Sequence, residues 1–591
     1  MLKKKKFIPQ LKKELLYFHN MKSFLLLINL VLISTVIYSQ TERETRAVWI
    51  TTNFRLDWPP PNYDPGIQRN ALTEILNDIK HKNFNTVFFQ VRSSGTTLFN
   101  SSYEPYSYYL TGHPGESPSY DPLEFAVEEA HKKGLELHVW INTFRCYAGS
   151  DDIILESPNH IVNRHPEWIK EVLESGKLTY WLNPGLPEVR KYLINVILEI
   201  AENYNIDGIH LDYIRYPGSD FDDSDAYRLY GSGMSLDDWR RNNINEFVKE
   251  LSLKVRKIKP YIKLGAAPFG IYKNIAGAVG SEGYSDVYQD SREWLRNGYV
   301  DYLVPQIYWD METNPRFDVL ADDWVNNSYG RNVVLGIGAY KGEVYKELDK
   351  LIDYSRKISS SGVSFFRYSF IKQYDFYSFH DKAFPAAMPW IDGFNPRPPV
   401  NLAASVTGGV PVKINLSWQR PLFSVNGDSA VYFAIYNFDS PFPQFTSENL
   451  LDVISSSKNR VSLAIDRPKQ VNYYFALKSL DKLWNESEHY SNIVEAKITS
   501  LENIAEKIKC PEQPLLVKDK RGSIHIIVFS DDFQNIDILM ESSGEFKFSE
   551  SLSLEKGVNI IALKDDKIEE KLIKFKYKLS GKEFILNQYN L

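Results

Sequence analysis

The sequence predicts an α/β fold, a (β/α)8 barrel (TIM barrel) followed by two small all-β domains. Three observations support this prediction: eight apolar runs alternate with amphipathic segments from about residue 46 to 370, no glycine-rich nucleotide-binding turn follows the first run, and short alternating strands fill the chain beyond residue 396. Eight strands alternating with helices is the count of a barrel, whose typical size is about 250 residues before loop insertions. A doubly wound sheet is the alternative, and the missing glycine-rich turn disfavours it.

Each expected strand is a short run rich in apolar, β-branched or aromatic residues. The eight runs are AVWIT (47–51), TVFFQV (86–91), ELHVWIN (136–142), GIHLD (208–212), KLGAAP (263–268), YLVPQIYW (302–309), VVLGIGA (333–339) and VSFFRY (363–368). The segments between them have helical spacing. In PEVRKYLINVILEIAENY, apolar residues recur every three or four positions after Pro187, which suits the first turn of a helix.

Length and composition bound the class of protein. The chain has 591 residues, which is too long for one hydrophobic core. Aromatic residues make up 14%, a surplus that suits contact with the flat faces of sugars, although cores and β-domains also use it. The net charge is −6 and no basic stripe occurs beyond the extreme N-terminus, which disfavours nucleic acid as a partner.

We expect four segments along the chain. They are an N-terminal extension and signal peptide at 1–40, the barrel at 43–390, a β-sandwich at 396–499 and a small β-domain at 510–580. The Pro-rich stretch FNPRPPVNL is typical of a stiff linker and marks the boundary after the barrel. The two β-domains could bind glycan, act as spacers or contact a partner protein.

The N-terminus has the plan of a secretory signal. Met21 and Lys22 precede the apolar run SFLLLINLVLISTVIYS, which ends in small and polar residues. We therefore expect an exported protein, located in the periplasm, the cell envelope or outside the cell, with Met1 or Met21 as its start. An uncleaved membrane anchor is the alternative. The two cysteines, Cys146 and Cys510, fall in different expected domains, which disfavours a structural disulfide.

The stretch NIDGIHLDYIRYPG (205–218) places polar groups directly after an apolar run. Chemistry in parallel barrels lies at the carboxyl ends of the strands, where Asp212 falls. The residues expected to bind substrate at these ends are Arg92, Trp140, Asn142, Tyr213, Arg215, Gln306, Tyr308, Trp309 and Arg367. Aromatic rings pack on the C–H faces of pyranoses, while amides and guanidinium groups bond the hydroxyls, so this set predicts a polysaccharide site. For any single residue, a hydrogen bond to a neighbouring loop is the structural alternative.

No metal or cofactor is expected. His138 and His210 lie inside expected strands, where a hydrogen-bonded core position is the simpler role. HxH and HExxH spacings, a GxSxG motif, a Cys–His nucleophile context and a Walker-type phosphate loop do not occur.

Seven ordered motifs resemble the glycosyl-hydrolase-like family ten of bacterial envelope proteins. They are TRAVWITTNFRLDWP, FFQVRSSG, SSYEPYSYYLTG, YWLNPGLPEVRKYL, DGIHLDYIRYP, YSDVYQDSREWL and DYLVPQIYW, and the resemblance covers about residues 43–390. It implies an exported glycoside-hydrolase barrel associated with peptidoglycan glycan strands. The family pattern carries onto Arg92, Asn183, Asp212, Arg215, Tyr216, Gln306 and Tyr308. Thr96 stands where the family commonly has an acidic residue after VRxxG, which argues against an acid/base role for that loop.

A second resemblance concerns the sandwich. RPPVNL, LSWQ, VYFAIY and YYFALKSLDKLWNES are similar to a fibronectin type III module, which implies a fibronectin III-like sandwich at 396–499.

Glycoside hydrolysis usually needs two carboxyl groups. Asp212 is the expected principal catalytic carboxylate, and Asp310, after the sixth run, is its nearest partner in a barrel, because Asp57 and Glu104 lie in loops. Alternatively, the N-acetyl group of the substrate supplies the nucleophile, which would suit a GlcNAc/MurNAc polymer. Arg215 is expected to keep Asp212 ionised.

The sequence therefore predicts an exported glycosidase, which hydrolyses O-glycosyl bonds of an envelope polysaccharide, with peptidoglycan as first choice. Secreted degradation of another polysaccharide is one alternative. A non-catalytic scaffold that binds glycan is the other.

Overall fold

The computed structural model describes most of the chain beyond residue 40. The described segments are 41–407, 412–423, 429–465, 472–498, 514–518, 524–530, 533–542, 545–555, 557–562, 573–578, 581–586 and 588–590. The expected signal peptide, the second domain boundary near 500–510 and Cys510 lie outside them. In the part of the chain that is described, no helix is both long and apolar enough to cross a membrane.

Eight parallel strand positions close into a barrel. They are β1 (Thr45–Ile50), β2 (Thr86–Ser93), β4 (Glu136–Asn142), β8 (Gly208–Asp212), β9 (Lys263–Ala266), β10 (Tyr302–Leu303), the two-part strand β11 (Asn332–Val333) and β12 (Leu335–Ile337), and β13 (Gly362–Phe365). The first strand pairs with β2 and β13, β10 pairs with β11, and β12 pairs with β13. Because β11 and β12 are parts of one strand interrupted at Val334, the ring closes, and the predicted barrel is confirmed.

The sixth strand is shorter than the sequence predicted. YLVPQIYW was expected to be a strand throughout, but regular pairing stops at Leu303. Pro305 follows, and a proline has no amide hydrogen to donate to the ladder. Pairing resumes only as single bridges from Gln306 to Phe269 and Gly336. Gln306 therefore lies at the carboxyl end of the barrel, beyond the regular strand.

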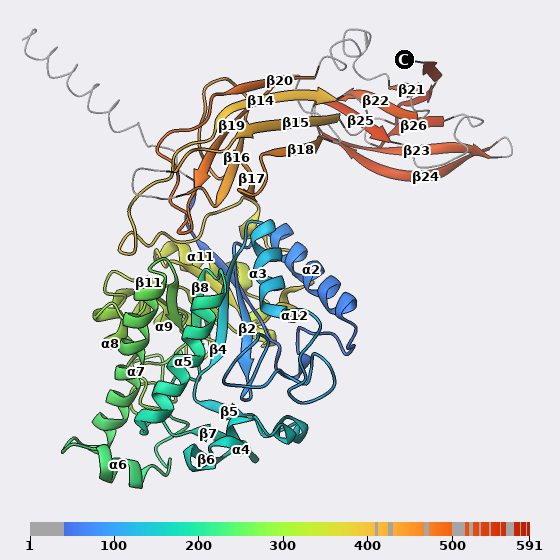
Figure 1. Cartoon of the computed structure of the whole chain (residues 1–591). Helices are drawn as coiled ribbons and strands as arrows, with labels where there is room; N and C mark the ends of the chain where they lie inside the picture. Colours follow the sequence, from blue (N-terminus) through green and yellow to red (C-terminus); the bar gives the residue numbers. More distant parts are fainter. Residues whose placement is uncertain are drawn as a thin grey trace, which may run out of the picture.

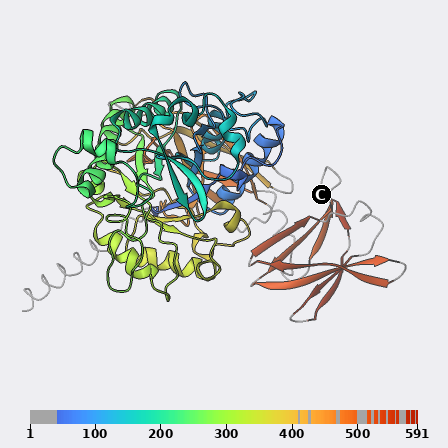
Figure 2. The same cartoon turned by 90° about the horizontal axis from the view of Figure 1, so that it is seen from below.

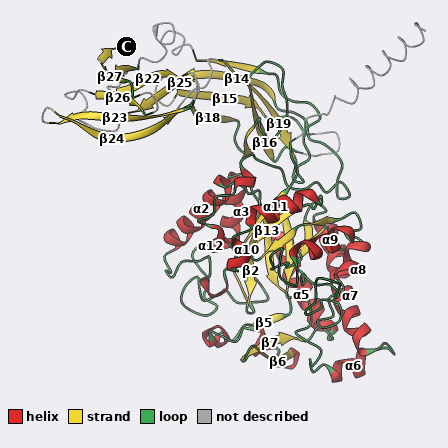
Figure 3. Ribbon diagram, turned by 180° about the vertical axis from the view of Figure 1, so that it is seen from behind, coloured by secondary structure: helices red, strands yellow, loops and turns green. Residues whose placement is uncertain are grey.

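Helices cover the outside of the barrel (Figure 3). The helices of residues 41–390 are α2 (Pro65–His81), α3 (Pro122–Lys132), α4 (Ile161–Arg164), α5 (Pro187–Asn203), α6 (Ser224–Tyr230), α7 (Leu236–Ile258), α8 (Ser291–Arg296), α9 (Phe317–Asn326), α10 (Gly342–Tyr345), α11 (Leu348–Lys357) and α12 (Tyr368–Ile371), of which α4 and α6 lie at the lower end of the barrel in Figure 1. Asp64 and Asp121 begin α2 and α3 by accepting hydrogen bonds from first-turn amides. The apolar face of α5, which includes Val189, Val196 and Ile200, is buried as its spacing predicts.

A small antiparallel sheet extends the loop after β4, and the sequence analysis did not predict it. Its strands are β5 (Arg145–Tyr147), β7 (Lys177–Leu182) and β6 (Ile169–Glu174), in that order across the sheet. Ser175 and Gly176, between β6 and β7, both have positive φ, as a two-residue type I′ turn requires. In Figure 1 this sheet lies at the lower end of the barrel. The short strand β3 (Thr96–Thr97) pairs with β2 nearby.

Residues 400–497 form two packed antiparallel sheets. One contains β14 (Val400–Thr407), β15 (Val412–Gln419) and β18 (Arg460–Ile465), and the other β17 (Leu450–Ser455), β16 (Tyr432–Phe438), β19 (Asn472–Leu480) and β20 (Val494–Lys497). Ile414 and Trp418 from the first sheet share a buried core with Phe433 and Phe475 from the second.

Two further sheets follow at the C-terminus. One contains β25 (Gly557–Ala562), β22 (Ile524–Ser530), β21 (Leu515–Lys518) and β28 (Gln588–Asn590), and the other β24 (Glu545–Leu554), β23 (Gln534–Ser542), β26 (Ile573–Tyr577) and β27 (Glu583–Leu586). Ile526, Ile536 and Phe575 are buried in their common core. Figure 2 shows these strands to one side of the barrel.

The sandwich contacts the amino-terminal end of the barrel, opposite the β5–β7–β6 sheet (Figure 1). Lys482 Nζ lies 2.7 Å from Asp207 Oδ1, just before β8. Lys80 Nζ, in the last turn of α2, lies 2.9 Å from Asp452 Oδ1. The sandwich therefore leaves the carboxyl ends of the barrel strands open.

Candidate active site

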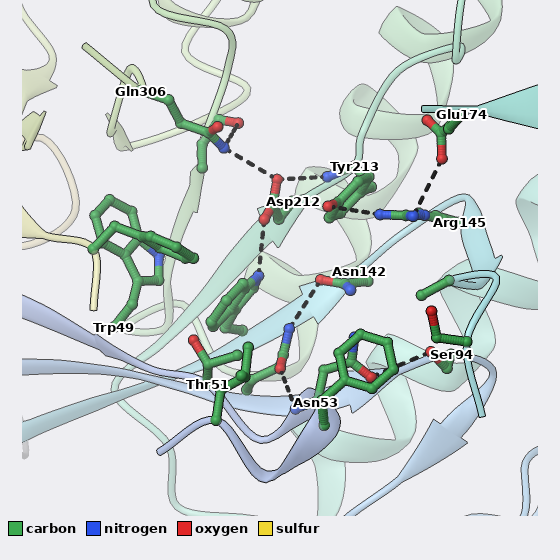
Figure 4. Close-up of a pocket in the computed structure, with 18 of the residues that line it drawn as sticks. Trp49, Thr51, Asn53, Ser94, Asn142, Arg145, Glu174, Asp212, Tyr213 and Gln306 are labelled. Carbon is green, nitrogen blue, oxygen red and sulfur yellow. Dashed lines mark hydrogen bonds and ion pairs between the residues drawn. The ribbon is translucent and has the colours of Figure 1, made fainter. Parts of the chain in front are cut away.

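A cavity of about 750 Å³ opens at the carboxyl ends of the barrel strands (Figure 4). All eight strand positions, or the loops directly after them, contribute to its lining, together with the β5–β7–β6 sheet. The predicted site residues that line it are Trp140, Asn142, Asp212, Tyr213, Arg215, Gln306 and Tyr308. The structure thus brings seven residues from three distant strand ends into one cavity.

The Asp212 carboxylate, at the end of β8, is held by three hydrogen bonds (Figure 4). Its Oδ1 accepts from the Tyr213 amide at 2.8 Å and from Gln306 Nε2 at 3.3 Å, and its Oδ2 accepts from Trp140 Nε1 at 3.2 Å. Tyr213 has a φ of +49°, so the chain changes direction sharply after the strand. These contacts fix the orientation of the carboxylate within the cavity.

Burial raises the pKa of Asp212 to about 6. The Tyr213 amide, the charge of Arg215 and the Trp140 indole each lower the pKa, but the loss of water outweighs them. Arg215 therefore acts in the expected direction, but burial is the larger effect and leaves the pKa of Asp212 above its ordinary value. A carboxyl group with a pKa near 6 can hold or release a proton near neutral pH, as a general acid or base must.

Arg215 lies beside the carboxylate among aromatic rings. One Nη1–H donates to the Tyr216 carbonyl oxygen at 3.0 Å, and the guanidinium lies 5.1 Å from the Trp181 ring centre and 4.8 Å from that of Phe269. Burial lowers the pKa of Arg215. A guanidinium carries five N–H donors. Since Arg215 lines the cavity, the donors not used by Tyr216 are available to a ligand.

Glu174 brings a second carboxylate to the cavity from the end of β6. Its Oε2 lies 3.2 Å from Arg145 Nη2, and Arg145 Nη1 donates to the Tyr213 hydroxyl at 2.9 Å. Figure 4 shows this chain of contacts leading from Glu174 through Arg145 and Tyr213 to Asp212. Within the described part of the chain, Glu174 and Asp212 are the two carboxylates that line the cavity.

The floor of the cavity is the Trp49 indole, which rests on a chain of hydrogen bonds along the barrel interior. Trp49 Nε1 donates to His210 Nε2 at 3.0 Å. Because an indole only donates, the proton of the neutral His210 ring is on Nδ1, 3.3 Å from the Tyr302 hydroxyl. That hydroxyl then donates to His138 Nδ1 at 2.7 Å, and His138 Nε2 donates to Glu136 at 3.3 Å. Both histidines occupy hydrogen-bonded core positions, and burial lowers the pKa of His210 well below its ordinary value.

A second polar cluster orients Asn142. The Gln90 side-chain oxygen accepts from the backbone amides of Thr52 at 3.0 Å and Asn53 at 2.9 Å. Its Nε2 donates to Asn142 Oδ1 at 3.3 Å. Because Asn142 Oδ1 accepts this hydrogen bond, the orientation of the Asn142 amide is fixed, and its Nδ2 group can donate to a ligand.

Asp310, the predicted second carboxylate, is not among the residues that line the cavity. Its Oδ1 accepts from the Glu312 amide at 2.8 Å and the Thr313 amide at 2.6 Å, and these bonds lower its pKa. The sequence predicts Asp310 at a strand end, but the chain has already left the sheet there and Asp310 caps its own loop. The structure therefore does not place Asp310 in the cavity with Asp212, whereas Glu174 lines it.

Three predicted substrate-binding residues also lie outside the lining. Arg92 is fully buried. Its Nη2 lies 2.6 Å from Glu104 Oε1, and its Nη1 donates to the Asn142 carbonyl oxygen. A register irregularity between Gln90 and Arg92 interrupts the alternation of strand β2, so Arg92 points away from the cavity. Arg367 Nη1 lies 2.7 Å from Asp57 Oδ1. Trp309 is half-buried, with Lys341 Nζ 5.3 Å from its ring centre.

The other residues carried over from the family pattern support the backbone near the cavity. Asn183 Oδ1 accepts from the Gly185 amide at 2.9 Å. Tyr216 is buried, and its hydroxyl accepts from Asn243 Nδ2 at 3.1 Å.

Sequence reasoning missed several lining residues, of which Trp49, Glu174, Phe366 and Phe370 matter most. Trp49 sits within the first apolar run, where alternation alone would have placed it inside the barrel. Glu174 had a signal, since the Ser-Gly pair after it is flanked by alternating residues that are typical of a hairpin.

The described residues contain no cluster of three or more His, Cys, Asp or Glu that could hold a metal ion.

A closed parallel barrel with a half-buried carboxyl group of raised pKa in an aromatic cavity at its strand ends is the arrangement of a barrel glycosidase. The chain belongs to the glycosyl hydrolase-like 10 family, because the model of that family matches residues 44–355, more than half of its length. The resemblance inferred from the motifs of the barrel is thereby confirmed, and the assignment supports glycosidase activity.

Two similar proteins are named as glycosyl hydrolases. Glycosyl hydrolase YngK of Bacillus subtilis (strain 168) is 38% identical over 320 residues, which cover 51% of this chain and 62% of that protein. Glycosyl hydrolase DigH of Escherichia coli (strain K12) is 32% identical over 377 residues, which cover 56% of this chain and 85% of that protein. Among solved structures, the catalytic domain of a β-amylase from Paenibacillus polymyxa matches 60% of this chain and 97% of its own, with 14% identity and a TM-score of 0.39.

Proposed function

We propose that the protein is an exported glycoside hydrolase that cleaves an envelope polysaccharide, with peptidoglycan glycan strands as the first choice. The observation that carries the hydrolytic part is Asp212, a half-buried carboxyl group with a pKa of about 6 in a cavity walled by aromatic and amide side chains. The resemblance of the barrel motifs to envelope proteins supports the choice of substrate. The export part rests on the signal-like run after Met21.

In the proposed reaction, the glycosidic C1–O bond breaks as Asp212 in its acid form donates its proton to the leaving oxygen. A second group either attacks C1 as the nucleophile or activates a water molecule that attacks C1. Glu174 is one candidate, as nucleophile or as the base that deprotonates water, since its carboxylate lines the same cavity. The acetamido oxygen of the substrate is the other, and water finally supplies the hydroxyl at C1.

Neighbouring side chains would bind the reacting sugar. The Trp49 and Trp140 indoles, both almost fully buried, close the cavity beneath the reacting sugar, and Gln306 and Arg215 offer N–H donors around Asp212. Hydrogen bonds to sugar hydroxyls are worth most where water is excluded, as at the bottom of this cavity.

The decisive experiment incubates the full chain with purified sacculi, with and without stem peptides, and analyses the soluble products for new reducing or anhydro ends. Release of such ends supports the proposal. Binding to sacculi without release would instead indicate a glycan-binding scaffold, and activity on other polysaccharides but not on sacculi would indicate a different substrate.

Three variants assign the roles. Asp212→Asn should lower turnover by about 10²–10⁴-fold, because it removes the acid/base group while keeping the shape of the side chain. Glu174→Gln should cause a comparable loss if Glu174 is the second carboxylate, and a small loss if the substrate assists. Asp310→Asn is the matched control, and we expect near-normal turnover because Asp310 is outside the cavity. Near-normal turnover of folded Asp212→Asn would contradict the assignment.

Export and the nature of the sandwich are separate proposals. N-terminal sequencing of the protein from fractionated cells should find a chain that begins near residue 40 outside the cytosol; an intact N-terminus in the cytosol would contradict export. The three-plus-four strand order of residues 400–497 supports a fibronectin III-like sandwich. Limited proteolysis should cut near 391–400 and near 500–510, and a resistant core that runs through both stretches would contradict the proposed division.

A further inference from the structure

Four aromatic rings form a continuous wall on one side of the cavity. This aromatic wall consists of Tyr308, Phe366, Tyr340 and Phe370, all of which line the cavity. The rings of Tyr308 and Phe366 stack with centroids 5.8 Å apart. The Tyr340 ring meets the Tyr308 ring edge-on with centroids 5.9 Å apart, and it lies tilted against the Phe370 ring with centroids 6.2 Å apart. The wall is thus one contiguous surface contributed by the ends of the sixth, seventh and eighth strand positions.

The aromatic wall runs from the Asp212 carboxylate to the solvent. Its inner end is formed by Tyr308 and Phe366. The Phe366 ring meets the Trp140 ring edge-on with centroids 6.3 Å apart, and Trp140 Nε1 donates to Asp212 Oδ2. Its outer end is exposed, because Tyr340 is 44% and Phe370 38% accessible. Aromatic side chains that are left exposed beside a cavity are typical of a ligand-binding surface.

Arg367 holds the outer end of the wall in place. Its Nη1 donates to the Leu56 carbonyl oxygen at 2.6 Å and lies 2.7 Å from Asp57 Oδ1. The guanidinium also packs on the Phe370 ring, 4.7 Å from its centre. One side chain therefore fixes Phe370 and the loop after β1 together, so the outer aromatic surface is ordered before any ligand arrives.

Other lining residues of the cavity are charged. Arg145, Glu174 and Lys177, from the β5–β7–β6 sheet, line it together with the wall. A ligand that fits both surfaces has an apolar face for the rings and polar edges for the charges. A chain of pyranose units has this character, since C–H groups gather on the faces of the rings and hydroxyls project from their edges.

We propose that the aromatic wall binds the sugar units next to the one that is cleaved, so the cavity accepts a stretch of polysaccharide rather than a single glycoside. The proposal rests on the proposed function, because Asp212 marks the point of cleavage. The cavity of about 750 Å³ is at the large end of the roughly 300–1,000 Å³ usual for ligand sites, which leaves room for more than one sugar.

The test measures binding in an inactive parent, Asp212→Asn, with glycan strands released from sacculi and separated by length. Into this full-length parent we would introduce Tyr340→Ala, Phe370→Ala or both. The double variant should bind strands of four or more sugars about tenfold or more weakly, because it removes two stacking surfaces, and should bind a disaccharide like the parent. Tyr377→Ala is the matched control: Tyr377 is 90% exposed and is not among the lining residues, so its removal should change neither affinity.

The outcomes separate this proposal from the hydrolytic one. Parent-like affinity of the double variant for long strands would overturn the aromatic wall as a binding surface, and so would a parent that binds no strand of any length. If the chain with Asp212 intact cleaves no glycan while the double variant still loses affinity for long strands, the hydrolase proposal fails and the binding surface stands. A single cooperative thermal transition and an unchanged circular-dichroism spectrum would verify that the double variant folds.

Discussion

At the scale of single residues, two aspartates near the strand ends show how surroundings set the proton affinity of one chemical group. Asp212 loses its water in the cavity, and its pKa rises to about 6. The Asp310 carboxylate accepts hydrogen bonds from the backbone amides of Glu312 and Thr313. These bonds stabilise the charged carboxylate and lower the pKa of Asp310. Both follow apolar runs, so nothing in their local sequence distinguishes them.

We predict that Asp212→Asn makes the protein more stable at pH 8. A carboxyl group whose pKa is higher in the folded than in the unfolded chain contributes to stability at low pH. This contribution is complete below the pKa of the unfolded chain, near 4, and is lost as the pH rises through the pKa of the folded chain, about 6. Above that pH the native protein buries a charge, which the asparagine does not. Because part of Asp212 is open to the cavity, we expect the free energy of unfolding of Asp212→Asn to exceed that of the native protein by about 1–2 kcal/mol at pH 8. This difference should disappear near pH 4.

Melting temperatures of the two proteins between pH 4 and 8 would test this prediction. Asp310→Asn is the control of opposite sign: its lowered pKa contributes stability above pH 4, so this variant should be less stable at neutral pH and approach the native protein as the pH falls. Equal melting temperatures of Asp212→Asn and the native protein at every pH would show that burial does not raise the pKa of Asp212.

At the scale of elements, strand β8 places two chemically different residues on one face. His210 and Asp212 are two positions apart, so both point into the barrel, and His210 lies one layer below. Phe88 stacks on the His210 ring with centroids 4.0 Å apart, which holds the ring where its Nε2 accepts from Trp49. The same strand therefore supplies the carboxylate and, through His210, supports the floor of the cavity.

We predict that His210→Leu destabilises the protein by about 1–3 kcal/mol, because the Trp49 N–H and the Tyr302 hydroxyl are left in the interior without this partner. His210→Gln should recover most of this loss, since its side-chain oxygen can replace Nε2 as the acceptor. Thermal unfolding measures the difference. In protein labelled with ¹⁵N-histidine, His210 should show a proton on Nδ1 and none on Nε2; a proton on Nε2 would contradict the hydrogen-bond chain.

At the scale of the whole molecule, the sandwich lies at the opposite end of the barrel from the β5–β7–β6 sheet (Figure 1), and that sheet lines the cavity. One of the contacts between the sandwich and the barrel involves Asp207, which is buried between His131 Nε2 at 2.7 Å and Lys482 Nζ at 2.7 Å. These two partners, after the opposing effect of burial, lower the pKa of Asp207. The sandwich thereby compensates a buried charge at the start of the strand that carries Asp212 at its other end.

We predict that Lys482→Met lowers the stability of the full chain by about 3 kcal/mol at pH 7, because it removes one partner of a buried ion pair. Lys80→Met is the matched control across the same interface. The Lys80–Asp452 pair is partly exposed, so its loss should cost less than about 1 kcal/mol. Melting temperatures and hydrogen exchange of residues 205–208 would measure the effect, and equal losses in the two variants would contradict it.

Much of the fold could be read from the sequence, because it depends on local patterns. The eight apolar runs and the helical spacing between them predicted the barrel, and the spacing of short strands beyond residue 396 predicted the β-sheets. The position of Asp212 at the end of β8 followed from the same pattern, since a strand that closes a parallel barrel presents its last residue to the common cavity.

Only the tertiary structure decided which charged groups share the cavity and in which protonation state. Arg92 and Asp310 met the same strand-end rule as Asp212, but a register irregularity buried one and a loop engaged the other. Glu174 reaches the cavity from a hairpin more than thirty residues before β8. The pKa of Asp212 depends on the balance between lost water and surrounding dipoles, which only the packing of distant segments determines.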